Sequence, residues 1–519
     1  MNMMTNFKNE PLTNFKSENN IKAFEKELDN VKKQFGNHYK AIIAGALVDT
    51  NEQLVSINPS NKNEIIGTVT KANTDTAELA MQTAYKYFEN WKNTTFKERS
   101  RILFKAAALM RKRKHEFSAW LVYESGKTWD EADGDTAEAI DFLEYYGRQA
   151  IELENRSRLT HLPGENNELY YLPLGVGVII TPWNFPLAIL TGMTSAALVT
   201  GNTTIVKPSE NTSIIAYKFV ELMIEAGIPN GVINFIPGIG SEVGEYLVKH
   251  SLTRFISFTG SRNVGLRINQ LAAIPNPNQK WMKRVITEMG GKDAIIIDQD
   301  TDLDFATDIV INSTFGFAGQ KCASCSRVII DQKIYDQTIE ILEKKIRNLK
   351  VGESDKLIND MGPVIDEAAY QKILKYIEIG KQEAILRCGG EITISEKDGY
   401  YIQPTLFVDV PVDSRIAQEE IFGPVLSVFK ADNFVHALEI ANNTDYGLTS
   451  SVISNNRKNL ELARKELHVG NLYFNRKCTG ALVGVHPFGG FNMSGTDSKA
   501  GGPDYLLLFT QPKLVSELF

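Results

Sequence analysis

Leu172-Pro-Leu-Gly-Val-Gly-Val-Ile-Ile-Thr-Pro-Trp-Asn-Phe-Pro186 is the stretch of sequence that decides the fold. Its apolar run predicts a buried strand that ends at Ile180, and the prolines on both sides of Asn184 predict a rigid turn after it. A helical pattern follows over residues 187–198, and a second strand over residues 202–207. A strand, a turn, a helix and a strand in this order predict a parallel sheet that is covered by helices.

The same alternation continues on both sides of this stretch. Downstream, we expect helices at residues 212–226 and 242–248 and strands at 231–236 and 254–258. A second alternating region starts at Arg327, with helices at 334–349, 367–380 and 434–441 and strands at 404–410 and 425–429. Upstream, short strands within 41–66 precede helices at 74–91, 96–123 and 131–155, and residues 505–510 are predicted to form a strand near the C-terminus. The predicted fold class is therefore α/β, with two doubly wound, Rossmann-like domains.

The composition is typical of a soluble globular protein with more than one domain. The chain has 519 residues, 43% of them hydrophobic and 23% charged, and its length exceeds what one core usually supports. The net charge of -7 and the lack of a basic stripe argue against nucleic acid as a partner. Three prolines interrupt the most apolar region, residues 170–198, which argues against a membrane helix.

Cysteine usage indicates the compartment. Four cysteines in a chain of this length are not a disulfide framework, so we expect a reducing, cytoplasmic environment. The N-terminus is polar, and no secretory signal is expected from it. Cys322 and Cys325 have the spacing of a metal-binding pair, but no second pair of ligands occurs at the required spacing, so we expect no metal site.

The run Phe317-Ala-Gly-Gln-Lys-Cys-Ala-Ser-Cys-Ser-Arg327 contains a candidate nucleophile, Cys322. A thiol attacks as the thiolate, which positive neighbours such as Lys321 and Arg327 favour. The alternative is that Cys322 is a small buried hydrophobic residue, the usual state of a free cysteine. Cys325 has no base or donor assigned to it and is predicted to belong to the core.

Two further polar residues could assist such a nucleophile. Asn184 is held rigidly at a strand end, where its amide could donate to an oxyanion, although a turn Asn that satisfies local backbone is the alternative. Glu288 precedes Gly290-Gly291 and an apolar run, so a raised pKa could make it a general base for water. The alternative for Glu288 is a solvated surface carboxylate.

Two strand ends carry features of a dinucleotide site. Phe258-Thr-Gly-Ser-Arg-Asn-Val-Gly265 places two glycines at a strand-to-helix turn, where bare backbone and a helix N-terminus favour a pyrophosphate. Its spacing lacks the Lys-Ser/Thr ending of a nucleoside-triphosphate loop, which disfavours a kinase or ATPase. Lys207 and Glu210 follow another strand and suit ribose hydroxyls, and Glu210 would repel a 2′-phosphate, which favours NAD over NADP. The alternative is a solvated pair of loop residues.

Taken together and in order, seven motifs resemble those of the aldehyde dehydrogenase superfamily. They occupy residues 181–186, 207–210, 258–265, 288–292, 319–322, 420–424 and 487–490. The resemblance implies an NAD-binding domain of residues 41–150 and 172–288 and a catalytic domain of residues 289–495. It also implies a small β flap for oligomerisation, formed by residues 151–171 and 496–519, and hence a homodimer or a dimer-based oligomer. A polar, partly helical lead-in of residues 1–40 precedes these domains.

The resemblance further implies a role for each matched residue. Cys322 would attack an aldehyde to give a thiohemiacetal, with the Asn184 side chain and the Cys322 backbone N–H as the oxyanion hole. Glu288 would activate water to hydrolyse the thioester that follows. The residues expected to bind NAD are Thr181, Pro182, Trp183, Lys207, Ser209, Glu210, Gly260, Ser261, Gly265, Glu420 and Phe422.

Within the superfamily, Gly470–Ala481 and Gly502–Tyr505 are similar to segments of the 1-pyrroline-5-carboxylate dehydrogenase family, which oxidises L-glutamate γ-semialdehyde to glutamate in proline and arginine catabolism. The implied substrate contacts are Glu138, Phe185, Ser324, Gly480, Ala481 and Phe488. A separate proline dehydrogenase is the implied functional partner. In one departure, this chain has Ala323-Ser324 where the family usually has Ser and then Ala after the nucleophile.

Two alternatives accompany this prediction. The departure at Ala323-Ser324 motivates an enzyme of the same mechanism for another semialdehyde, such as succinate semialdehyde. A non-catalytic NAD-binding protein on the same fold is the second alternative, because a fold does not by itself imply an activity. The presence of Cys322, Glu288 and Asn184 together argues against it.

Overall fold

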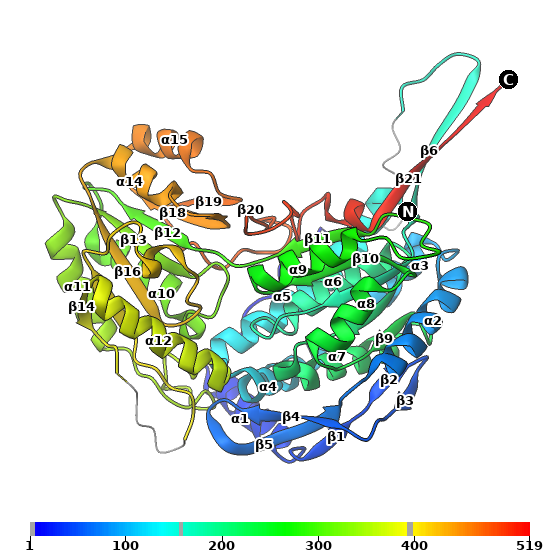
Figure 1. Ribbon diagram of the computed structural model, residues 1–519, viewed down its shortest axis with the longest axis horizontal. Helices are drawn as coiled ribbons and strands as arrows, with labels where there is room; N and C mark the ends of the chain where they lie inside the picture. Colours follow the sequence, from blue (N-terminus) through cyan, green and yellow to red (C-terminus); the bar gives the residue numbers. More distant parts are fainter. Residues whose placement is uncertain (1–5, 155–158, 392–397) are drawn as a thin grey trace.

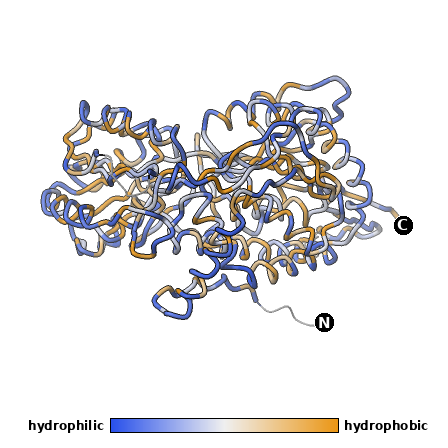
Figure 2. The backbone as a smooth tube through the Cα atoms, turned by 90° about the horizontal axis from the view of Figure 1, so that it is seen from below, coloured by the Kyte–Doolittle hydropathy of each residue, from blue (hydrophilic) through white to orange (hydrophobic). Residues whose placement is uncertain are grey.

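The computed structural model describes residues 6–154, 159–391 and 398–519. Two lobes, each built around a seven-stranded sheet, lie side by side, and a two-stranded arm extends from one of them (Figure 1). Hydrophobic segments concentrate inside both lobes, and hydrophilic segments lie mostly at their surface (Figure 2). The residues outside the described ranges belong to the predicted lead-in (1–5), flap (155–158) and catalytic domain (392–397).

In the described part of the chain, no helix is both long enough and apolar enough to span a membrane.

The first sheet has the strand order β11-β10-β7-β8-β9-β2-β3. Its strands are β2 (Ala41–Ile43), β3 (Ala46–Val48), β7 (Val176–Ile180), β8 (Thr203–Lys207), β9 (Ile233–Phe235), β10 (Thr253–Thr259) and β11 (Arg284–Glu288). The strands from β11 to β9 are parallel, and β2 joins β9 in antiparallel orientation. The carboxyl ends of the parallel strands therefore meet at one edge, which is where doubly wound folds bind their ligands.

Both faces of this sheet are buried, because consecutive side chains of a strand point to opposite faces. Ile179 and Val206 belong to one hydrophobic core, and their neighbours Val178 and Ile205 belong to another. The first core is built with α3 (Phe96–Lys112), α4 (Lys114–Ser125), α5 (Trp129–Glu154), α6 (Ala188–Val199) and α7 (Ser213–Ala226). The second is built with α2 (Thr74–Trp91), α8 (Glu245–Lys249) and α9 (Arg262–Ala273). Burial on both faces explains the unbroken apolar runs in these strands.

The single helix predicted over residues 96–123 is wrong, because two helices, α3 and α4, meet at Arg113. Arg113 leaves the helical conformation, with φ -106° and ψ 21°. After this bend nearly all side chains of α4 are buried, including those of Lys114 and Glu124. The apolar pattern therefore continues through the break and does not reveal it.

The second sheet has the order β14-β15-β16-β13-β12-β18-β19, in which β14 is antiparallel to its neighbour. Its strands are β12 (Asp293–Ile297), β13 (Cys325–Asp331), β14 (Ile385–Cys388), β15 (Thr405–Val408), β16 (Val425–Ala431), β18 (Thr449–Ile453) and β19 (Asn471–Phe474). The helices of this lobe are α10 (Leu303–Thr314), α11 (Tyr335–Arg347), α12 (Glu367–Glu383), α13 (Arg415–Gln418), α14 (Phe434–Asn442) and α15 (Arg457–Glu466). The predicted α/β class with two doubly wound sheets is confirmed.

The arm consists of β6 (Glu165–Pro173) and β21 (Thr510–Leu518), which pair antiparallel from Pro173–Thr510 to Glu165–Leu518 and extend away from the body (Figure 1). The strand predicted from residue 505 begins only at Thr510. Residues 505–509 form a 3-10 helix instead, in which Tyr505 is buried and stacks on Tyr146 with ring centroids 5.5 Å apart. Small sheets of β1 (Asn37–Tyr39), β4 (Gln53–Asn58) and β5 (Asn61–Thr70), and of β17 (Tyr446–Gly447) and β20 (Phe491–Asn492), complete the fold.

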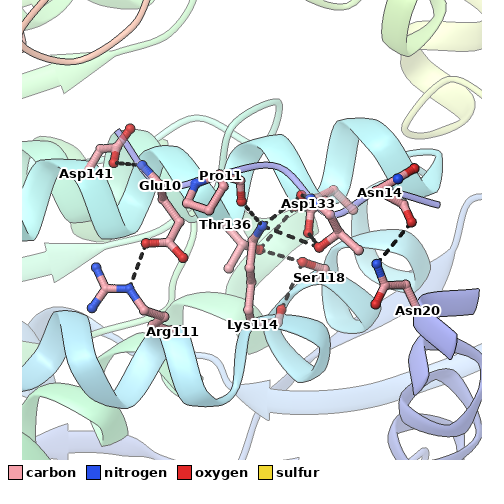
Figure 3. A network of polar contacts seen from close by, with 12 residues as sticks. Glu10, Pro11, Asn14, Asn20, Arg111, Lys114, Ser118, Asp133, Thr136 and Asp141 are labelled. Carbon is pink, nitrogen blue, oxygen red and sulfur yellow. Dashed lines mark hydrogen bonds and ion pairs between the residues drawn. The ribbon is translucent and has the colours of Figure 1, made fainter. Parts of the chain in front are cut away.

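The N-terminal segment is attached to the first lobe by buried carboxylates of α5 (Figure 3). The backbone N–H of Glu10 donates to Asp141 over 2.6 Å, and that of Thr13 donates to Asp133 over 2.7 Å. Lys114 reaches the same Asp133 over 2.8 Å. Helix α1 (Glu18–Lys32) then packs against α4. The lead-in is thus an integral part of the lobe that carries α5.

Candidate active site

Four turns that follow strands of the first sheet lie at one edge. Ile180 is the register partner of both Lys207 and Phe258, and Thr259 is the partner of Glu288. The backbone continues this alignment, since Thr181 N–H donates to Lys207 O over 3.3 Å and Gly260 N–H donates to Glu288 O over 3.0 Å. Residues 181–184, 208–210 and 260–261 and Glu288 are therefore neighbours, as parallel strand ends require.

The candidate nucleophile lies just before β13 of the second sheet, after an unusual backbone turn. Phe317, Ala318 and Gly319 all have positive φ, at 52°, 53° and 70°. Positive φ costs energy for residues other than glycine and is retained where the surroundings enforce it. The fully buried Gln320 does so, since its side chain donates to Phe317 O over 3.2 Å and accepts from Ile365 N–H over 2.9 Å.

Asn184 connects the sheet edge to this turn. Its side-chain Nδ2 donates to Gln320 O over 3.1 Å, so an amide of the first lobe lies within two residues of Cys322. Asn184 is only 4% exposed. An amide nitrogen carries two hydrogens, so this contact leaves one of them for another acceptor.

Glu288 is half-buried at the end of β11 and accepts hydrogen bonds from the Ser498 hydroxyl and from Gly490 N–H, the latter over 3.3 Å. Burial raises the pKa of Glu288 to about 8. The chain then passes between the lobes, where a Cβ atom at Gly291 would stand 2.5 Å from Cys322 O. The two glycines therefore allow the backbone after Glu288 to run directly beside the nucleophile.

The expectation that Lys321 and Arg327 favour a thiolate is wrong for this structure. Lys321 is paired with Glu131 of α5 over 2.6 Å, and Arg327 donates to the carbonyls of Lys292, Ile440 and Ala441. Burial raises the pKa of the Cys322 thiol, and the nearby carboxyl groups of Asp293, Glu288 and Glu420 raise it further. Both effects favour the neutral thiol over the thiolate.

The residues predicted to hold a dinucleotide line the same edge. Lys207 is 3% exposed and pairs with Glu210 over 2.9 Å, and Glu210 also accepts from Gly240 N–H over 2.8 Å. Gly260 and Ser261 lie directly before α9, whose first N–H groups are left without helical partners. A Cβ atom at Gly265 would stand 2.5 Å from Met289 Sδ, which explains the second glycine. Glu210 and Lys207 suit the hydroxyl groups of a ribose, and the N-terminus of α9 suits a pyrophosphate.

The second lobe contributes the remaining cofactor candidates. Glu420 accepts from Gly291 N–H over 3.1 Å. Phe422 has a positive φ of 62° and lies edge-on to Trp183, with ring centroids 5.4 Å apart. Pro182 and Ser209 lie in the turns after β7 and β8. The predicted cofactor residues of the first lobe thus lie at strand ends, in the turns after them and, for Gly265, in the first turn of α9. Glu420 and Phe422 lie in the segment between α13 and β16.

Among the described residues, no group of His, Cys, Asp and Glu side chains is arranged to hold a metal ion.

The predicted substrate residues come from both lobes. Phe185 follows Asn184, and the Lys127 ammonium lies 3.8 Å from its ring centre. Burial raises the pKa of Glu138 on α5 to about 8. The segment that includes Gly480 and Ala481 approaches the nucleophile, since Cys478 Sγ donates to Ala323 O over 3.3 Å. Phe488 pairs with Ala500 through two backbone hydrogen bonds in the strip that also carries Gly490, the donor to Glu288.

Ser324 lies apart from this group. Its hydroxyl is buried in a small cavity that Thr314, Ser326 and Glu420 also line, and no described residue hydrogen-bonds it. The backbone of Ala323 faces Cys478 instead. The structure therefore brings Ala323, rather than Ser324, to the segment of Gly480 and Ala481.

Sequence reasoning missed a set of buried charges beside the site. Lys127 and Asp135 are fully buried, 3.4 Å apart, and Lys127 also lies over the Phe317 ring at 4.3 Å. Glu131 on α5 holds Lys321. Glu131 and Asp135 occupy i and i+4 positions of α5, one turn apart, so their spacing in the sequence places both side chains on one face of the helix. Nothing in the sequence indicated which cations they meet.

The chain belongs to the aldehyde dehydrogenase family, whose model matches residues 47–515. It is 59% identical over 517 residues to 1-pyrroline-5-carboxylate dehydrogenase of Anoxybacillus flavithermus, with 100% of both chains covered. A crystal structure of 1-pyrroline-5-carboxylate dehydrogenase from Thermus with bound NAD is 51% identical over 100% of both chains, with a TM-score of 0.98. Proline utilization A of Bdellovibrio bacteriovorus is 44% identical, with a TM-score of 0.97, over 99% of this chain and 53% of that one. The predicted family is confirmed.

Proposed function

We propose that this chain catalyses the NAD-dependent oxidation of L-glutamate 5-semialdehyde, which is in equilibrium with 1-pyrroline-5-carboxylate, to L-glutamate. The observation that carries the proposal is the convergence of three groups from two lobes. Asn184 contacts the turn before Cys322, and the backbone after Glu288 passes beside Cys322. The full-length similarity to proteins named 1-pyrroline-5-carboxylate dehydrogenase supports this substrate.

The chain's own residues carry the acyl chemistry. Cys322 Sγ bonds to the aldehyde carbon while its proton passes to Glu288, and the oxyanion accepts hydrogen bonds from Asn184 Nδ2 and the Cys322 backbone N–H. Lys207, Glu210, the turn before α9 and Glu420 would hold NAD, which would supply the hydride acceptor that the oxidation to a thioester requires. Glu288 then releases this proton to solvent and takes a proton from water as hydroxide adds to the thioester carbon. The C–S bond breaks to release glutamate, and the leaving thiolate of Cys322 takes the proton back from Glu288.

The remaining residues orient the substrate. Backbone N–H groups of Gly480 and Ala481 bind the α-carboxylate, since a turn of free N–H groups is an anion site. Phe185 and Phe488 pack against the aliphatic chain, and Glu138 lies toward the amino group. Ser324, with its buried hydroxyl, is the member of this set that the geometry supports least.

A comparison of substrates tests the proposal. Purified protein is expected to reduce NAD with 1-pyrroline-5-carboxylate, and Cys322→Ala is expected to abolish this activity. Ala323-Ser324 favours one rival, a dehydrogenase for succinate semialdehyde, which lacks the amino group. A kcat/KM at least about tenfold higher for succinate semialdehyde, a difference of about 1.4 kcal/mol, would select that rival.

We further propose a cytoplasmic homodimer or dimer-based oligomer in which the arm of β6 and β21 contacts a partner subunit. Leu514 and Leu518 are 59% and 80% exposed on this arm, which supports the proposal. The substrate would come from a separate proline dehydrogenase. Light scattering of the full chain and of a variant that ends before Thr510 tests the assembly, and a monomeric full chain would contradict it.

A further inference from the structure

The segment of residues 476–486, which follows β19, carries an arginine that donates to the backbone next to it. We infer that Arg476 is a positioning residue for the substrate carboxylate, because it fixes the peptide groups of Gly480 and Ala481 so that their N–H groups face the site. The inference rests on the proposed function. It concerns a side chain that contacts the turn and not the substrate.

The hydrogen bonds of Arg476 define the orientation of two consecutive peptides. Its Nη2 donates to Thr479 O over 3.2 Å and to Gly480 O over 3.0 Å. In a trans peptide the C=O and N–H bonds point in opposite directions. The N–H groups of Gly480 and Ala481 therefore point away from Arg476.

These two N–H groups share one side of the turn, because the carbonyls of both peptides meet the same Arg476 nitrogen. Gly480 has a φ of 74°, and a left-handed residue in a turn lets successive N–H groups converge on one anion. Within the described ranges, no residue accepts a hydrogen bond from either N–H group. The guanidinium of Arg476 lies on the carbonyl side of these two peptide groups. Its positive charge also favours an anion on their N–H side.

The turn lies next to the nucleophile. Cys478, two residues before Gly480, donates from its thiol to Ala323 O over 3.3 Å, and Ala323 directly follows Cys322. An anion on the N–H pair would therefore be held beside the aldehyde-binding thiol, as a short amino-acid semialdehyde requires.

Arg476 itself is held from two sides. Its guanidinium lies over the Tyr473 ring of β19, 4.4 Å from the ring centre. Its Nη1 lies 2.9 Å from His486 Nε2, and Leu482 N–H lies 3.1 Å from His486 Nδ1, so a neutral ring accepts from one of these two donors. Burial and the neighbouring Arg476 lower the pKa of His486. A neutral His486 leaves the arginine charge available to the turn.

Two substitutions at Arg476 test the inference. Arg476→Gln removes the charge and the forked donor, and Arg476→Lys keeps the charge but offers one ammonium to two carbonyls. Arg457→Gln is the matched control, since Arg457 is 73% exposed and pairs with Glu461 on the surface of α15. For each protein, kcat and KM are measured with 1-pyrroline-5-carboxylate, with NAD, and with butanal, an aldehyde without a carboxylate.

Arg476→Gln is expected to raise the KM for 1-pyrroline-5-carboxylate at least about tenfold, and Arg476→Lys by about threefold, with kcat nearly unchanged. The KM for NAD and the kcat/KM for butanal should stay within about twofold of the wild type. An unchanged KM for 1-pyrroline-5-carboxylate would overturn the inference. An equal loss with butanal would also overturn it, because Arg476 would then support the fold of the site in general.

The outcomes separate this inference from the proposed function. If the wild type does not oxidise 1-pyrroline-5-carboxylate, the proposed function fails before any variant is compared. If the wild type does so and Arg476→Gln does not fold, Arg476→Lys decides alone. A KM for 1-pyrroline-5-carboxylate equal to that of the wild type in a folded Arg476→Lys variant then counts against the inference.

Discussion

Glu288→Gln should stop turnover, because on the proposed mechanism Glu288 both accepts the proton of Cys322 and activates the water that hydrolyses the thioester. The substitution keeps the shape of a half-buried side chain that accepts from Ser498 and Gly490, but it removes the base. Burial raises the pKa of Glu288 to about 8. A carboxyl group with this pKa is ionised to about one tenth at pH 7 and to about nine tenths at pH 9. If hydrolysis limits turnover, wild-type kcat should therefore rise about tenfold between these pH values.

Rapid mixing with NAD and substrate provides the assay. Glu288→Gln should be slower by about 10²–10⁴-fold in steady state, the usual contribution of a general base. Its rate should not rise between pH 7 and pH 9 as the wild-type rate does. If the wild-type thiol transfers its proton to another acceptor, the variant should still form NADH stoichiometrically and accumulate a thioester on Cys322, visible by mass spectrometry. Cys322→Ala should show neither. Steady-state turnover above about one tenth of wild type at pH 9 would refute a base role for Glu288.

Three further changes probe the same site. Asn184→Ala should lower kcat by about 10²–10³-fold through loss of an oxyanion donor, with the KM for NAD unchanged, and a loss in NAD affinity alone would contradict this. Ser498→Ala removes a donor that lowers the pKa of Glu288, so the rising limb of the kcat profile should move to higher pH, and a move to lower pH would be the wrong sign. Ala323→Ser combined with Ser324→Ala should lower the KM for 1-pyrroline-5-carboxylate by about tenfold through one hydrogen bond to the carboxylate, whereas an unchanged KM would show that the hydroxyl does not reach it.

The sheet edge could be predicted from the sequence, because each piece of it is local. A buried strand followed by a polar or glycine turn occurs at Ile180, Lys207 and Thr259, and parallel strands must end on the same side. The tertiary contacts could not be predicted in this way. Asn184 meets Gln320 across 136 residues of sequence, through the packing of two lobes. Apolar periodicity describes burial, so it also concealed the bend at Arg113.

The charges around the nucleophile show the limit of sequence proximity most clearly. Lys321 is adjacent to Cys322 in the chain, yet its ammonium is paired with Glu131, which is 190 residues away. Burial raises the pKa of Cys322, and the carboxyl groups that face the thiol from other elements raise it further. On the proposed mechanism, the thiolate forms only as Cys322 gives its proton to Glu288. A proton acceptor whose pKa is itself raised by burial suits this step, because it holds the proton well enough to take it from a thiol and releases it near neutral pH.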